Sequence, residues 1–293
     1  MASALSVART GIARLRDFPR RTRQLRLPWI SLSIVTVLVV CAVFAPLVAP
    51  HDPYRIDMSI AKVAPGETWG HPLGTDIMGR DMLSRLIYGA RTSMFMALVA
   101  LGSGAVAGTV LGLISGYRGG WVDAVIMRAT DASLGFPTIL VAMIALVLLG
   151  SGLEIIVLAV ALNVWDRFSR MIRGEVLYIK EMDFVTLARV AGVSAPVTIW
   201  RHIFPNTVNT FMVMTSLQVG QVILLEASLS FLGLGLAPGA PAWGIMVAEG
   251  RTVILDTWWL SLLPGLAITA VVLAFNFLGD WMRDALDPKL RRV

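Results

Sequence analysis

Few side chains in this 293-residue sequence could carry chemistry, and nucleotide hydrolysis is the first chemistry to test. A phosphate-binding P-loop requires a Gly-Lys pair before Ser or Thr, because its backbone amides and its lysine hold the phosphates. The only lysines are Lys62, Lys180 and Lys289, and they follow alanine, isoleucine and proline. The sequence therefore predicts no ATP site in this chain, and energy would have to come from another chain or from an ion gradient.

Metal binding and thiol chemistry are the next candidates. His51, His71 and His202 fall on different segments, so we interpret each as a lone polar residue rather than a metal ligand. Cys41 is the only cysteine and lies in an apolar run, which is typical of a small core residue and gives no disulfide framework. The sequence predicts neither a metal site nor a catalytic residue.

Acids inside apolar stretches remain, because a charge in a bilayer is costly and such residues are often functional. Glu226 is the one acid well inside such a stretch. Two roles stay open for it: pairing near the outer boundary beside Ser228 and Ser230, or lining a transport pathway. Asp131 follows Arg128 by three residues, so we expect these two to pair on one helix face.

The composition indicates the elements that must position these residues. The chain is 56% hydrophobic and only 15% charged, with a mean hydropathy of +0.74, whereas soluble domains carry about 25% charge. We therefore expect an all-α polytopic membrane protein with six transmembrane helices. The apolar segments are 27–50, 92–117, 122–150, 155–165, 207–235 and 257–279.

Two of these segments need comment. Gly135 and Pro137 should bend the third. The fourth has only 11 uncharged residues between Glu154 and Asp166; we expect its helix to start near Gly152 and to continue through Arg167 and Arg170 into the cytoplasm.

The basic residues predict the orientation. With six spans both termini lie in the cytoplasm, and 19 of the 25 Lys and Arg residues then fall on that side, as the positive-inside rule requires. We attribute the net charge of +6 to the orientation of the chain in the membrane and not to nucleic-acid binding. The expected organisation is a basic cytoplasmic tail (1–28), a first helix with an extracytoplasmic segment (29–88), a transmembrane domain (89–281) and a cytoplasmic tail (282–293).

A stripe of small residues marks the second span. Four glycines recur every four residues, so they share one helix face and let another helix approach closely; they are Gly104, Gly108, Gly112 and Gly116. The preceding stretch, 80–93, alternates apolar and charged residues at helical spacing. We expect it to lie as an amphipathic helix along the outer surface.

The stretch 183–206, DFVTLARVAGVSAPVTIWRHIFPN, predicts two short helices joined at Gly192. Its first helix should present one apolar face, formed by Phe184, Leu187, Ala188 and Ala191. Ser194 can cap the second helix, whose first turn holds Pro196, and Pro205 should end it. A compact knob that shows apolar side chains to water requires a partner.

This knob resembles the EAA loop of importer-type ABC permeases, which reads Glu-Ala-Ala, three residues, Gly, nine residues, Ile, one residue, Leu-Pro. Here Thr186-Leu187-Ala188 stands in place of Glu-Ala-Ala, and His202 and Phe204 replace Ile and Leu. Without the glutamate one polar contact to the ATPase is lost from the pattern, but the spacing of the motif is kept. The resemblance implies that the residues coupling the chain to an ATPase are Thr186, Leu187, Ala188, Gly192, Arg201, His202 and Pro205.

Four more stretches resemble the second (C-type) permease subunit of the dipeptide, oligopeptide and nickel ABC importers. They are LGTDIMGRDMLSRLIYGART at 73–92, GYRGGWVDAVIMR at 116–128, EASLSFLGLG at 226–235 and LGDWMRDALDPKL at 278–290. The resemblance covers about residues 25–291. It implies a type I ABC importer permease fold with cytoplasmic coupling helices, in the bacterial inner membrane.

The resemblance also implies the partners and the mechanism. The partners would be a homologous permease subunit, two ATPase subunits that bind ATP and Mg, an extracytoplasmic substrate-binding protein and the lipid bilayer. The chain itself would hold no cofactor and perform no chemistry, but would form half of the pathway and switch between inward- and outward-facing states.

Alternatives remain for the cargo and for the class of transporter. Di- or oligopeptides are the expected cargo, while nickel, glutathione and oligosaccharide importers share this architecture. An ion-coupled secondary transporter would explain the missing ATP site, but it predicts mid-membrane acids and repeated halves, of which only Glu226 is visible. A channel or scaffold would leave the knob unexplained.

Overall fold

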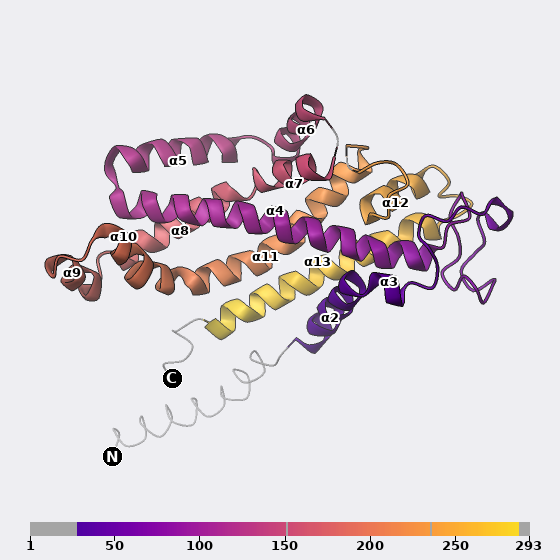
Figure 1. Cartoon of the computed structure of the whole chain (residues 1–293), viewed down its shortest axis with the longest axis horizontal. Helices are drawn as coiled ribbons and strands as arrows, with labels where there is room; N and C mark the ends of the chain where they lie inside the picture. Colours follow the sequence, from indigo (N-terminus) through magenta and orange to yellow (C-terminus); the bar gives the residue numbers. More distant parts are fainter. Residues whose placement is uncertain (1–27, 151, 235, 287–293) are drawn as a thin grey trace, which may run out of the picture.

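The computed structural model describes residues 28–150, 152–234 and 236–286 (Figure 1). Nearly all of the predicted basic tail, the end of the C-terminal tail and Gly235 lie outside these ranges. Within the described residues the regular elements are helices, with one isolated antiparallel bridge between Thr75 and Asp81. The predicted all-α fold class is confirmed.

The helices follow one another along the chain, and the longest stretch between two of them is 61–81. They are α2 (Trp29–Val43), α3 (Ala45–Val48), η1 (Met58–Ile60), α4 (Met82–Arg118), α5 (Gly120–Gly135), α6 (Thr138–Leu149), α7 (Leu153–Ala161), α8 (Trp165–Ile179), α9 (Asp183–Val190), α10 (Ala195–Thr198), η2 (Ile199–Ile203), α11 (Phe204–Phe231), α12 (Trp243–Arg251) and α13 (Trp259–Leu286).

Three uninterrupted helical stretches among the described residues are long and apolar enough to cross a membrane: 82–118, 195–231 and 259–286. The bent pair α5 and α6 makes a fourth if it counts as one span. α2, at 15 residues, is apolar but shorter than the roughly 20 residues that a span needs. The structure therefore gives three to four candidate spans, and the predicted count of six stays a prediction.

The predicted bend in the third apolar segment is confirmed. The axes of α5 and α6 meet at 92°. Phe136 has an extended backbone, with φ −96° and ψ 140°, because the ring of Pro137 disfavours helical geometry in the residue before it. The apolar segment therefore turns a sharp corner where a straight span would continue.

The fourth apolar segment begins where the sequence placed it, since Gly152 is the N-cap of α7. It does not run straight into the next helix, because α7 ends at Ala161 and α8 begins only at Trp165. α8 is amphipathic: Phe168, Ile172 and Val176 are fully buried, while Arg170 is exposed.

The expectation of a surface helix over 80–93 was wrong. Asp81 caps α4, which runs unbroken for 37 residues, and Arg80, Asp81 and Arg85 are at most 3% exposed. The amphipathic pattern was read correctly as helical, but its charged face is covered by other parts of the chain. One of these is α12, which lies between the apolar segments 207–235 and 257–279.

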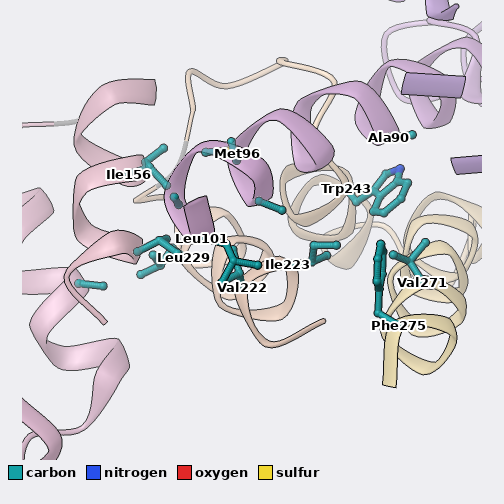
Figure 2. Close-up of a cluster of buried hydrophobic side chains, with 14 of the residues drawn as sticks. Ala90, Met96, Leu101, Ile156, Val222, Ile223, Leu229, Trp243, Val271 and Phe275 are labelled. Atoms are coloured by element: carbon teal, nitrogen blue, oxygen red, sulfur yellow. The ribbon is translucent and has the colours of Figure 1, made fainter. Parts of the chain in front are cut away.

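The main core surrounds α4, which lies along the long axis of the molecule (Figure 1). Met96 and Leu101 of α4 belong to one buried cluster with Ile223 of α11 and Phe275 of α13, and Trp243 of α12 lies beside them (Figure 2). A second cluster joins the C-terminal part of α4 to α8, α9 and η2. Buried apolar contact therefore connects the knob to the helices.

The molecule has two distinct ends along this axis. We call residues 51–81 together with α12 the outer end, and α9, α10 and η2 the inner end, after the orientation predicted above. Figure 1 shows the two at opposite extremes, with α4, α11 and α13 running between them.

Candidate functional site

The connection between α9 and α10 has the geometry that a glycine permits. Gly192 has φ +77°, and the amides of Gly192 and Val193 bond to the carbonyls of Arg189 and Ala188, at 3.0 Å each. This pair of bonds is the Schellman ending of a helix, whose left-handed residue is usually glycine and sometimes asparagine. The prediction that Gly192 joins two short helices is confirmed.

The apolar face of α9 differs from the predicted one. Val185 and Ala188 are the buried residues of this helix, whereas Phe184, Leu187 and Ala191 are exposed. Val185 packs into the second core cluster, and that anchors α9 to η2. The remaining apolar side chains therefore point away from the protein.

The knob exposes several large apolar side chains. Leu187 is 67% exposed, Val190 81% and Trp200 59%. Thr186 and Arg201 are also exposed, and His202 is partly buried. Of the seven residues that the resemblance assigns to coupling, Ala188 alone is buried.

Pro205 does not end the second helix of the knob, contrary to the prediction. α10 passes through a π-helical turn, η2, directly into α11, and Pro205 lies in the first turn of α11. Proline has no backbone N–H to donate, and here it lies inside the continuous helical stretch 195–231, directly after the π-helical turn. Ser194 is the N-cap residue of α10 as predicted, although its side chain makes no capping hydrogen bond.

The four glycines of α4 face α7 and α8. A Cβ built at Gly104 would lie 2.8 Å from the carbonyl oxygen of Ala161, and one at Gly112 2.7 Å from that of Ser169. At Gly108 it would collide with the carbonyl oxygen of Trp165. Because backbone cannot move aside as a flexible side chain can, this helix pair requires glycine at these positions.

On the side of α8 away from α4, ion pairs fix α8 to α5. Asp131 pairs with Arg170, so the predicted partnership of Asp131 with Arg128 is wrong. The guanidinium of Arg173 binds both oxygens of Asp123, at 2.6 Å each. Packing of α8 against α5 offers these carboxylates a partner with better geometry than a neighbour on the same helix.

A cavity of about 340 Å³ lies between α6, α8 and α11. Apolar side chains form much of its wall, and its polar side chains are Thr138, Asn163, Arg167, Gln218, Gln221 and Ser228. The Arg167 guanidinium donates to Gln218 Oε1 at 3.3 Å. Among the described residues no carboxylate lies within salt-bridge distance of it. The sequence predicts Arg167 at the inner interface, whereas in the structure it lines this cavity.

Glu226 lies in α11, the helix that also carries Gln218, and it is buried. It is 1% exposed, and it accepts hydrogen bonds from Ser230 at 2.8 Å and from Ser93 at 3.3 Å. It is not among the residues that line the Arg167 cavity. Its bond to Ser93 joins α11 to α4, which is the pairing role that the sequence left open beside a pathway role.

The outer end contains a buried ion network that the sequence analysis missed. Asp76 Oδ2 accepts from Arg80 Nε and Arg85 Nη1 at 2.6 Å each. Glu249 of α12 accepts from the same two arginines, at 3.1 and 2.8 Å. The spacing of Asp76 and Arg80 permits a pair, but Glu249 lies more than 160 residues away and no local pattern points to it.

The reading of the histidines as unrelated polar residues was wrong for two of them. The rings of His51 and His71 lie 4.6 Å apart, and both face Asp81. The loop from 51 to 81 returns to the start of α4, so residues on separate segments meet there.

The comparisons with known proteins agree with this architecture. Residues 108–292, more than half of the chain, match the family described as binding-protein-dependent transport system inner membrane component. Residues 14–65 match the N-terminal TM domain of oligopeptide transport permease C.

Individual relatives extend over almost the whole chain. The glutathione transport system permease protein GsiD of Pectobacterium atrosepticum is 38% identical over 94% of this chain and 91% of its own length. GsiD of Escherichia coli O157:H7 is 40% identical over 94% and 90%. The dipeptide transport system permease protein DppC of Bacillus subtilis is 36% identical over 98% and 89%.

These matches decide between the classes that the sequence left open. An ion-coupled transporter, a channel and a scaffold are set aside, because the matching family consists of inner-membrane components of binding-protein-dependent transport. Such a component works with ATPase and binding-protein partners. The chain belongs to this family, as a C-type permease component of the peptide ABC importers.

Proposed function

We propose that the chain forms half of a pathway that imports short peptides, in a heterodimer with a homologous permease. Two ATPase subunits would bind at the inner end, and a substrate-binding protein would deliver cargo at the outer end. The relatives named for dipeptide and glutathione transport support this cargo class.

The Arg167 cavity is the observation that carries the cargo proposal. A peptide presents a C-terminal carboxylate and several amide groups. Arg167 offers a guanidinium that matches a carboxylate, and Asn163, Gln218 and Gln221 offer donors and acceptors for amides. Apolar wall between these groups accepts side chains without selecting one, which suits a transporter of varied peptides.

The knob carries the coupling proposal. Its exposed apolar side chains, Leu187, Val190 and Trp200, would dock in a groove of the ATPase. η2 joins the knob to α11 without a break, and α11 lines the Arg167 cavity. A push on the knob would therefore move a wall of the pathway as a rigid body.

Uptake of matched peptides tests the cargo proposal. The complete importer would be reconstituted in vesicles with its binding protein and given a dipeptide or the same dipeptide as a C-terminal amide. Arg167→Gln should lower uptake of the free acid about 10- to 100-fold, the value of a hydrogen bond to a charged group, and should affect the amide less.

Arg128→Gln is the matched control, because Arg128 lies on α5 and does not line the cavity. Equal uptake of both peptides by the wild type and by Arg167→Gln would reject a carboxylate site at Arg167. An importer that moves no peptide at all, but hydrolyses ATP with its cognate binding protein, would reject the peptide cargo itself.

A further inference from the structure

Three side chains capable of binding a metal converge at the outer end. One ligand atom from each of His51, His71 and Asp81 lies within 4.8 Å of the other two. His71 Nδ1 is 2.9 Å from Asp81 Oδ1, and His51 Nδ1 is 3.8 Å from Asp81 Oδ2. These residues come from three places: the chain after α3, the outer loop, and the cap of α4.

The start of α4 holds this cluster in place. Asp81 Oδ2 accepts from the Ser84 amide at 2.7 Å, which fixes the carboxylate as the helix cap. The hydroxyl of the same Ser84 accepts from the His51 amide at 3.0 Å. His71 is held by its own backbone, which donates to Thr68 and accepts from Gly74. Such supporting contacts orient metal ligands in known sites.

One ligand atom in the cluster has no partner. His51 Nδ1 is buried from solvent and makes no hydrogen bond, although a buried polar nitrogen normally has a partner. It faces the carboxylate of Asp81, which is 1% exposed. A cation between the imidazoles and this carboxylate would satisfy the nitrogen and the charge together.

We propose that His51, His71 and Asp81 bind a divalent transition-metal ion, with Zn²⁺ as the probe. Two imidazoles and one carboxylate are a ligand set that Zn²⁺ and Ni²⁺ accept, whereas Mg²⁺ prefers oxygen alone. Tetrahedral bonds of about 2.0–2.1 Å put neighbouring ligand atoms about 3.4 Å apart. The observed 2.9 Å runs to Oδ1 of Asp81 and the observed 3.8 Å to its Oδ2, so small side-chain rotations are needed to bring both imidazoles and the carboxylate onto one ion.

The site adds a link between segments that otherwise meet through hydrogen bonds, such as the one from the His51 amide to Ser84. A bound ion would tie the chain after α3 and the 51–81 loop to the first turn of α4. Because the ion binds the folded arrangement and not the unfolded chain, it stabilises the outer end in proportion to its occupancy.

Metal binding to the purified full-length chain tests this proposal. The protein, carried on a tag without histidine, is stripped with chelator and equilibrated with Zn²⁺ or Ni²⁺, with Mg²⁺ as the negative control. We expect one Zn²⁺ per chain and a rise in Tm on adding it. His51→Ala and His71→Ala should each weaken binding at least 10-fold and abolish the rise in Tm.

His202→Ala is the matched control, since the third histidine lies in η2 at the inner end. His51→Ala is the informative variant, because it leaves the Asp81 cap of α4 intact; its Tm without metal should equal that of the wild type. Stoichiometric Zn²⁺ binding that survives in the His51→Ala, His71→Ala double variant, or an equal loss in His202→Ala, would overturn the site. Absence of Zn²⁺ binding by the wild type would leave the cluster as a hydrogen-bonded joint only.

Discussion

The two ends of this permease differ in the kinds of side chain that they bury and expose. At the outer end, Arg80 and Asp76 are buried and, with Arg85 at the start of α4, form ion pairs within the same chain. At the inner end, Leu187 and Trp200 are large apolar side chains left in solvent. Charges that pair within the chain need no other protein, whereas large apolar side chains left in solvent form a surface for one.

Because of this difference, we expect mutations to act differently at the two ends. Changes at the outer end should act through folding, because they strand buried charges. Changes on the exposed face of the knob should leave folding intact and act through the partner. The predictions below test that separation, in order of decreasing effect on stability.

Arg85→Ala should have the largest effect. It removes a guanidinium that is 1% exposed and leaves Arg80 as the one arginine that Asp76 and Glu249 share. Breaking one side of a buried pair costs about 3–5 kcal/mol. We expect a marked loss of folded protein, measured by thermal unfolding in detergent.

Arg91→Ala on the same helix is the control, since Arg91 is exposed and surface changes cost at most about 0.5 kcal/mol. If Arg85→Ala and Arg91→Ala unfold at the same temperature, the outer end does not depend on its ion network.

Gly108→Leu should come next. A side chain there meets the carbonyl of Trp165, so α4 and α8 must separate, at a cost of about 1–3 kcal/mol or more. Gly102→Leu is the control, because a Cβ at Gly102 meets nothing within 4 Å. Thermal unfolding should distinguish the two, and equal stability would mean that α4 and α8 do not pack as the structure has them.

Gly192→Val should destabilise the protein less than Gly108→Leu, but it should uncouple transport from ATP hydrolysis. A β-branched residue at φ +77° is strained by roughly 1–2 kcal/mol, and the strain falls on the joint between α9 and α10. We expect ATP hydrolysis by the complex to continue while transport is lost.

Gly192→Asn is the companion variant, because asparagine tolerates the left-handed conformation. It should restore much of the coupled transport. Normal uptake by Gly192→Val would show that this joint does not transmit the ATPase movement.

Leu187→Asp should have the smallest effect on folding. Leu187 is 67% exposed, so the variant should unfold within about 0.5 kcal/mol of the wild type. Co-purification of the ATPase subunits should nevertheless fall sharply. Undiminished co-purification would place the ATPase contact elsewhere on the chain.

Local patterns in the sequence predicted much of this structure. The bend before Pro137, the glycine face of α4 and the left-handed Gly192 each follow from one residue type and its spacing, which local backbone rules read directly. Fold class and family likewise came from hydropathy and from motifs in order.

Long-range partners could not be predicted in the same way. Asp131 has Arg128 close in sequence, but α8 brings Arg170 to it. His51 and His71 are 20 residues apart, and only the return of the outer loop to α4 brings them together. The burial of Arg85 depends on α12, whose position no local signal in 80–93 encodes. Tertiary contact decides which of several permitted partners a charged side chain finds.

The most direct test of the account asks which side of the membrane the knob faces. A single cysteine at the exposed Ser194, in a Cys41→Ala background, would be treated with a membrane-impermeant thiol reagent in intact cells with a permeabilised outer barrier. A second variant places the cysteine at the exposed Ala237, before α12. The account predicts that Ala237→Cys reacts in intact cells and that Ser194→Cys reacts only after the inner membrane is opened. Labelling of Ser194→Cys from outside would contradict it, since the knob could then meet no cytoplasmic ATPase.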